Sequence, residues 1–191
     1  MNKPKIKQLE EFWRQIGAGI ITRENLQIFL EKKGNVQEKM ERAEIFHVTV
    51  PSQPLKKIIA DGNYSYANDY ITSENFSLDE SQIGDFELIL VHLNRKATTD
   101  EVLAELKERN LEPAKIGHLL AFGADYPEIQ REFPIAALGS SWVDPDGFRG
   151  VPYLEGNDAE RGLSLGWRGH HWDDGWRFLA LRKSALGSLD S

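Results

Sequence analysis

Residues 166–178, GWRGHHWDDGWRF, concentrate the side chains of this chain that are best suited to molecular recognition. Three of the five tryptophans fall here, and tryptophan combines a large apolar surface with an N–H donor, as the centre of a binding interface requires. The charged and imidazole side chains between them supply orienting polar contacts. We predict a binding surface made of these residues: Trp167, Arg168, His170, His171, Trp172, Asp173, Asp174, Trp176 and Arg177.

The same tryptophans also have a structural interpretation. Trp167 and Trp176 would stand at the two ends of a hairpin and pack across its strands, so one or two of the three tryptophans are expected in the core. The residues from His170 to Asp174 are then expected near the surface, because an exposed turn keeps so many polar groups hydrated.

A second aromatic run, DGNYSYANDYI, covers residues 61–71. Tyr64, Tyr66 and Tyr70 alternate there with small polar residues, a composition that is typical of recognition loops. The alternative is a tyrosine-rich loop that lies over a sheet. Both interpretations remain open, and the three tyrosines join the predicted binding residues.

Metal binding and catalysis are the rival interpretations of the polar residues. His170, His171, Asp173 and Asp174 are potential metal ligands, but adjacent histidines on a strand point to opposite faces, and no recognised ligand spacing is present. The chain has no cysteine, which excludes disulfides and thiolate catalysis. We expect no cofactor and favour a non-enzymatic binding module. The alternative is a metal-assisted or acid–base enzyme of unknown reaction.

The charge balance bears on the partners. A net charge of −7 argues against nucleic acid, because non-specific binding to phosphates needs an excess of lysine and arginine. A basic patch is expected only if the strands that carry residues 94–96 and 181–183 are neighbours. No run of about 18 apolar residues predicts a membrane span, and no apolar signal segment follows the basic start. The cytoplasm is the default expectation, with an unknown protein or other ligand as partner.

Two groups of elements are expected to position these side chains. Residues 1–44 carry two helical patterns, which predict an N-terminal helical arm; a homo-oligomer formed through this arm is the third functional interpretation. Residues 45–191 are expected to form a single α+β domain. Its first part reads as a strand at 45–50, a short helix at 55–59 and a strand at 85–93.

The next part begins with a helix after Thr98, where Glu101 completes a capping box and Asn110 marks the end. Another helix is predicted from Pro113 to Gly123, and a turn or two of helix before Pro134. Four short runs then predict a C-terminal antiparallel meander. They are IAALGSSW, RGVPYL, RGLSLGW and WRFLALRK. The fold class is α+β, with helices first, a mixed middle and an antiparallel sheet last.

Four longer motifs carry a resemblance over about residues 45–183. They are ADGNYSYANDYITSENF, FELILVHLNR, LLAFGADYPEIQREFPIAALGSSW and WDDGWRFLALRK. In these motifs the chain resembles a family of small proteins from uncultured candidate-phylum bacteria. That family has no assigned activity, so the resemblance implies a shared fold and no chemistry.

A more distant resemblance concerns the C-terminal part. Gly139, Ser140 and Trp142 look like one strand of C-type-lectin-like domains. Trp176, Arg177 and Phe178 look like the closing strand, although Trp176 stands where those domains have glycine. The related enzymes depend on cysteines, which this chain lacks. The resemblance therefore implies a scaffold that displays side chains for binding, here from the 143–149 turn, the 155–160 loop and the 168–176 loop.

Overall fold

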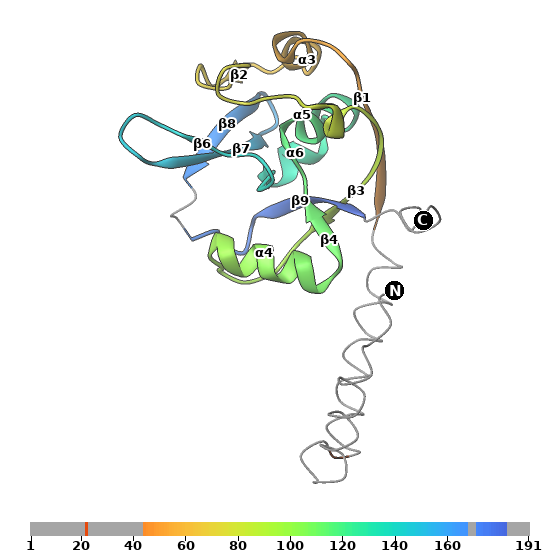
Figure 1. The fold of residues 1–191 in the computed structure, drawn as a ribbon, viewed down its shortest axis with the longest axis vertical. Coiled ribbons are helices and arrows are strands. Elements are labelled where there is room, and N and C mark those ends of the chain that lie inside the picture. Colours follow the sequence, from red (N-terminus) through yellow and green to blue (C-terminus); the bar gives the residue numbers. More distant parts are fainter. Residues whose placement is uncertain (1–21, 23–43, 168–170, 183–191) are drawn as a thin grey trace. The chain divides into compact units, whose positions relative to one another are not determined.

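The computed structural model describes Thr22, residues 44–167 and residues 171–182 (Figure 1). Except for Thr22, these residues belong to one compact unit. A nine-stranded mixed sheet and four helices make up this part of the chain, which confirms the predicted α+β class. The helical arm predicted over residues 1–44 lies almost wholly outside the described residues.

The sheet has the strand order β1-β3-β9-β5-β7-β8-β2, with β4 also paired to β9 and β6 to β7. Neighbouring strands are antiparallel except for the pairs β5–β9 and β2–β8, which are parallel. The strands are β1 (Ile45–Val50), β2 (Tyr66–Ala67), β3 (Gly84–Val91), β4 (Leu111–Pro113), β5 (Ile135–Ala136), β6 (Trp142–Val143), β7 (Arg149–Gly156), β8 (Arg161–Trp167) and β9 (Arg177–Arg182).

The last strand departs from the predicted meander. Instead of lying beside β8, β9 lies inside the sheet between β3 and β5, with β4 paired to its C-terminal half. Phe178, Leu179 and Ala180 are all buried, and successive strand residues point to opposite faces, so β9 needs cover on both sides. A position beside β8 would lack that cover. Trp167 and Trp176 are therefore not the two ends of one hairpin.

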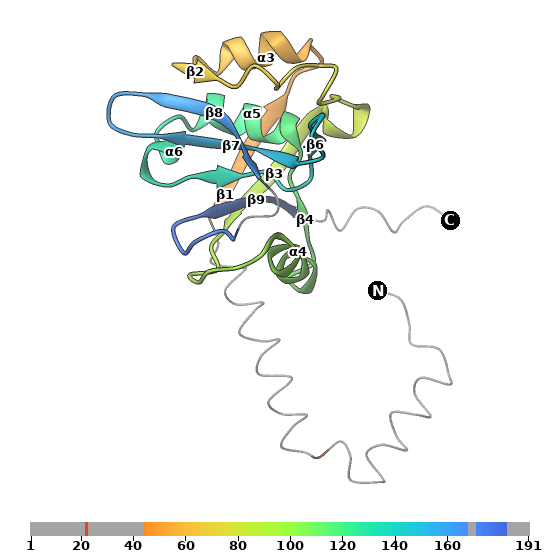
Figure 2. The same cartoon turned by 90° about the vertical axis from the view of Figure 1, so that its left-hand side faces the viewer.

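Helices supply this cover on both faces (Figure 2). On one side lie α3 (Leu55–Asp61), α5 (Ile116–Asp125) and α6 (Ile129–Glu132), and α4 (Thr99–Glu108) packs on the other. The main core lies under α5, where Leu119 and Phe122 meet Phe46, Leu88 and Leu179. We call the two sides of the sheet the α5 side and the α4 side.

Local signals in the sequence set the ends of α4. Thr98 Oγ1 accepts a hydrogen bond from the Glu101 amide at 3.2 Å, and the Glu101 carboxylate accepts one from the Thr98 amide at 2.7 Å. This confirms the predicted capping box. The helix ends before Asn110, whose φ of 56° lies in the left-handed region that asparagine tolerates.

The helix predicted from Pro113 to Gly123 has different bounds. Pro113 belongs to β4, and α5 starts three residues later and continues past Gly123. A Cβ atom at Gly123 would lie 2.3 Å from the Tyr64 hydroxyl and 2.9 Å from Leu154 Cδ1. This glycine allows the helix to pack closely against the sheet and does not end it. Among the described residues, none of the helices is long and apolar enough to cross a membrane.

Candidate functional site

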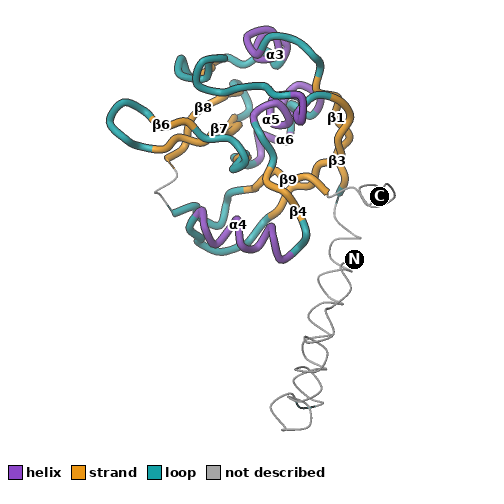
Figure 3. Tube along the Cα trace, viewed as in Figure 1, coloured by secondary structure: helices purple, strands orange, loops and turns teal. Residues whose placement is uncertain are grey.

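The register of β6, β7 and β8 places two tryptophans on the α5 side of the sheet. Trp142 lies opposite Gly150, and Gly150 lies opposite Trp167, so the two tryptophans share one face. Leu154, four residues beyond Gly150, points to the same side and packs under α5. The β6–β7 hairpin and its loop project from the rest of the sheet (Figures 1 and 3).

Exposed rings gather on this side of the hairpin. Phe148 is 62% exposed and contacts Trp167, which is 38% exposed, with ring centroids 5.7 Å apart. Tyr70 is 56% exposed and stacks on Trp142 at 4.9 Å. We call these four residues the aromatic face. They form two ring pairs, and they come from two strands and two loops in different parts of the sequence.

Of the three late tryptophans, only Trp167 belongs to this face. Trp172 is 3% exposed, donates a hydrogen bond from Nε1 to Thr99 Oγ1 at 3.0 Å, and forms a two-residue bridge with Ala97. Trp176 is half-buried, with its ring 4.6 Å from that of Trp172. The prediction of Trp172 as a binding residue is corrected: it fills the core beside α4, as the structural interpretation of the tryptophans allowed.

The polar residues of the same segment are only partly described. Arg168 and His170 lie outside the described residues. His171, Asp173 and Asp174 are exposed, in agreement with the expected surface position of this loop.

Hydrogen bonds in this loop shape a turn. The Asp173 carboxylate accepts from the Gly175 amide at 2.9 Å, and the carbonyl oxygen of Asp174 lies 2.7 Å from His92 Nε2. The part of the chain that the structure describes contains no group of three or more side chains placed to hold a metal ion.

Arg177 is half-buried and makes structural contacts, and its contact role stays a prediction. Its guanidinium lies 4.4 Å from the centre of the Phe133 ring and donates to the Gly175 carbonyl at 2.9 Å. Burial lowers its pKa. These contacts hold the turn that leads into β9.

The three tyrosines of residues 61–71 divide between the two interpretations. The Tyr64 ring packs over Gly62, and its hydroxyl is buried without a hydrogen-bond partner, so burial raises the pKa of this phenol. Tyr64 is half-buried and packs against the core, which supports the alternative of a loop lying over the sheet; its contact role stays a prediction. Tyr66 and Tyr70 are exposed, at 55% and 56%.

Arg161 was not predicted to be buried, yet it is only 8% exposed. Its guanidinium donates to the carbonyl oxygens of Gly62 and Gly123 and, at 3.1 Å, to Gln130 Oε1. Gly62 ends α3, and Gly123 lies in the last turns of α5, so one cation satisfies the C-terminal carbonyls of two helices. An arginine after a polar turn normally looks solvent-exposed in a sequence.

A second unforeseen cluster joins α5 to the short 3₁₀ helix at Glu80–Gln82. Lys115 Nζ lies 3.0 Å from both Asp79 Oδ2 and Ser81 Oγ. Hydrogen bonds from Ser81 and Lys115 lower the pKa of Asp79 to about 2. Lys115 contacts both Asp79 and Ser81, so the cluster ties the start of α5 to the 3₁₀ helix.

His118 is buried beside this cluster. Its Nδ1 accepts a hydrogen bond from the Lys115 amide at 3.0 Å, and its Nε2 is buried without a partner. Burial and the charge of Lys115 lower the pKa of His118 to about 4. The ring is therefore neutral at pH 7.

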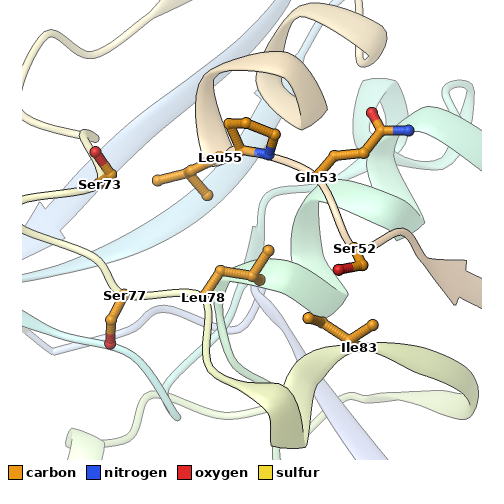
Figure 4. Close-up of a pocket in the computed structure, with 8 residues that line it drawn as sticks. Ser52, Gln53, Leu55, Ser73, Ser77, Leu78 and Ile83 are labelled. Carbon is orange, nitrogen blue, oxygen red and sulfur yellow. The ribbon is translucent and has the colours of Figure 1, made fainter.

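A cavity of about 540 Å³ opens between the segment after β1 and residues 73–83 (Figure 4). Figure 4 shows leucine and isoleucine side chains beside serine hydroxyls. The lining carries no ionisable side chain, so it provides no acid or base. The lining residues are Ser52, Gln53, Pro54, Leu55, Ser73, Ser77, Leu78 and Ile83.

The condition set for a basic patch is met only in part. Strands β3 and β9 are neighbours, as that prediction required, but they are antiparallel. Residues 94–96 follow Val91, which pairs with Phe178 near the start of β9, whereas Arg182 at its other end pairs with Leu111. Residues 94–96 and Arg182 therefore lie at opposite ends of the strand pair.

The α4 side of β7 and β8 carries Tyr153 and Ser164, which the sequence analysis missed, beside Glu155 of the predicted 155–160 loop. Tyr153 lies opposite Ser164 and Glu155 opposite Gly162, and the Ser164 hydroxyl donates to Glu155 Oε1 at 2.6 Å. Alternation along β7 was the available signal, because Tyr153 and Glu155 are two residues apart.

Comparisons of the chain with protein-family models, with curated proteins and with solved structures found no match.

Proposed function

We propose that this protein is a non-enzymatic binding module that recognises a protein partner through its aromatic face. The observation that carries the proposal is the exposed pair Phe148–Trp167, which leaves two large rings in contact with water at a projecting hairpin. Aromatic side chains dominate the energy of protein interfaces because they bury much apolar area and have few rotatable bonds.

The shape of the surface favours a protein over a small molecule. Small ligands are usually held in concave sites of about 300–1,000 Å³. The aromatic face lies instead on a hairpin and the strand beside it, and the cavity of Figure 4 is lined by other residues. A projecting patch with exposed rings fits the centre of a protein–protein interface.

The other predictions stay proposals of lower rank. An acid–base enzyme would need a base near a nucleophile, and Lys115 beside Ser81 is engaged by Asp79. A homo-oligomer formed through residues 1–44 remains a prediction, as do the C-type-lectin-like scaffold, the bacterial-family resemblance and the cytoplasmic location.

Affinity capture with matched variants tests the proposal. The full-length chain serves as bait in a lysate of its source organism, beside Trp167→Ala, Phe148→Ala and Tyr70→Ala. The matched control is Val143→Ala, because Val143 is exposed on the same hairpin but alternates with Trp142 and so points to the opposite side of the sheet. Mass spectrometry of the captured proteins is the readout.

We expect a protein that wild type and the control retain and that the three aromatic-face variants lose. Truncation of a central aromatic residue should weaken binding by about 2 kcal/mol or more. If every variant retains the same proteins, the aromatic face is not the contact surface. Circular dichroism of each bait shows beforehand that the variant is folded.

A further inference from the structure

The α4 side of the sheet holds a second group of aromatic and acidic side chains, toward the opposite end of the β7–β8 pair from the aromatic face. Tyr66 on β2 lies beside Gly162 on β8, which lies opposite Glu155 on β7. These partners share one face, and the alternation along β7 puts Tyr153 there as well. Tyr66 and the aromatic face are thus on opposite sides.

The rings and the carboxylate lie on this one face of the sheet. Trp176 contacts Tyr153 edge-to-face, with ring centroids 5.0 Å apart. A Cβ atom at Gly162 would lie 3.3 Å from Glu155 Cγ, so the Glu155 side chain extends over the bare backbone of β8. Tyr66 is 55% exposed, and Tyr153, Glu155 and Trp176 are each half-buried. The group is therefore ordered by packing and still open to solvent.

The charge of this group is uncompensated. Glu155 accepts a hydrogen bond from the neutral Ser164 hydroxyl, and within the described ranges no lysine or arginine forms an ion pair with it. Arg161, its neighbour across the strand end, binds backbone carbonyls instead. Burial and the negative charge of Glu155 raise the pKa of Tyr153. A carboxylate and three electron-rich rings thus share one surface without a cation.

We propose that Tyr66, Tyr153, Glu155 and Trp176 form a binding site for an organic cation of the alkylammonium class. Such a cation is attracted by the faces of tyrosine and tryptophan rings and by a nearby carboxylate. The Ser164 hydroxyl keeps Glu155 in place over β8. The site is independent of the aromatic face, because the two lie on opposite sides of the sheet.

Choline and its neutral isostere 3,3-dimethylbutan-1-ol test this site, because they match in shape and differ in charge. Binding is followed by NMR of the full-length chain through the indole N–H signal of Trp176, which is assigned with the Trp176→Phe variant. We expect choline to shift this signal in a saturable manner and the neutral alcohol to shift it much less. Equal binding of the two compounds, or no shift with either, would overturn the proposal.

Variants of two glutamates test whether choline binding depends on the carboxylate of Glu155. Glu155→Gln keeps the size of the side chain and an acceptor for Ser164, and it should raise the Kd for choline by about fivefold or more. Glu160→Gln is the matched control, because it removes one exposed carboxylate from the adjoining loop and should leave the Kd unchanged. If Glu155→Gln binds choline as tightly as wild type does, the negative charge of Glu155 does not contribute to recognition of the cation.

Further variants separate this proposal from the proposed function. Tyr66→Leu, at an exposed position, should weaken choline binding without disturbing the fold. Trp167→Ala should abolish partner capture and leave choline binding intact, so each proposal can fail alone. A neutral disaccharide that shifts the Trp176 signal equally in wild type and Glu155→Gln would identify a saccharide site and refute the cation site.

Discussion

Replacement of Arg161 by methionine tests whether one buried guanidinium holds the helices to the sheet. The variant keeps most of the side-chain volume and removes all donors. Gly62 and Gly123 then have carbonyl oxygens without a donor. The residue four positions after Gly123 is Pro127, which has no N–H, so the helix itself cannot satisfy that oxygen. Gln130 Oε1 loses its bond from the guanidinium as well.

The magnitude follows from these three acceptors. Each buried acceptor left without a donor costs about 1–3 kcal/mol, which gives a gross loss of about 3–9 kcal/mol. Removal of a buried cation that has no carboxylate partner offsets part of this loss. We expect Arg161→Met to lower the free energy of unfolding by about 3 kcal/mol, a large share of the stability of an ordinary domain.

Urea denaturation of the full-length chain, followed by tryptophan fluorescence, measures this loss. Arg161→Lys keeps the charge but cannot reach both helix ends, so it should lose about half as much. Arg95→Met is the control, because its ion pair with Glu101 is about half-exposed and should contribute less than about 1 kcal/mol. A loss below about 1 kcal/mol for Arg161→Met would refute this account of the guanidinium.

The remaining predictions concern pH, packing and the tryptophans. The pKa of His118 is about 4 in the folded protein and 6.5 in its ordinary state, so the unfolded chain binds more protons between these values. The free energy of unfolding should therefore fall by up to about 3 kcal/mol as the pH decreases from 6.5 to 4. Urea titrations over this pH range should show the decrease for wild type and not for His118→Phe. Gly123→Ala should lower the thermal midpoint, at a cost of about 1–3 kcal/mol, because its methyl group would overlap Tyr64; an unchanged midpoint would mean that the ring moves aside freely. Trp172→Ala should cost about 3–5 kcal/mol in urea denaturation, whereas Trp167→Ala should cost less than about 1 kcal/mol, and similar losses would contradict their assigned burial.

Features that depend on a few neighbouring residues were predictable from the sequence. The capping box of Thr98 and Glu101 and the strand bounded by Pro51 both lie where expected, because hydrogen bonds and backbone restrictions within a few residues decide them. The exposed tyrosines at 66 and 70 were also in the predicted contact set.

Features that depend on distant contacts were not predictable. The apolar run Phe178–Ala180 fits an edge hairpin or a central strand equally well until the cover by α4 and α5 is known. Trp172 looks like a contact residue until its bond to Thr99 is seen. Phe148 was covered only as part of the 143–149 turn and was not singled out, because a single phenylalanine in a turn gives no periodic signal, yet it is the most exposed large apolar side chain among the described residues.

The central position of β9 has a consequence for how the chain reaches its fold. During synthesis β9 leaves the ribosome after every other described strand, yet it alone connects β1 and β3 with β5, β7 and β8. Its partners are far away in sequence, as in the pair Leu88–Leu181, so this step closes long loops and should be slow. Until β9 is synthesised, the two halves of the sheet each keep an edge strand without a partner. These edge strands are β3 in one half and β5 in the other.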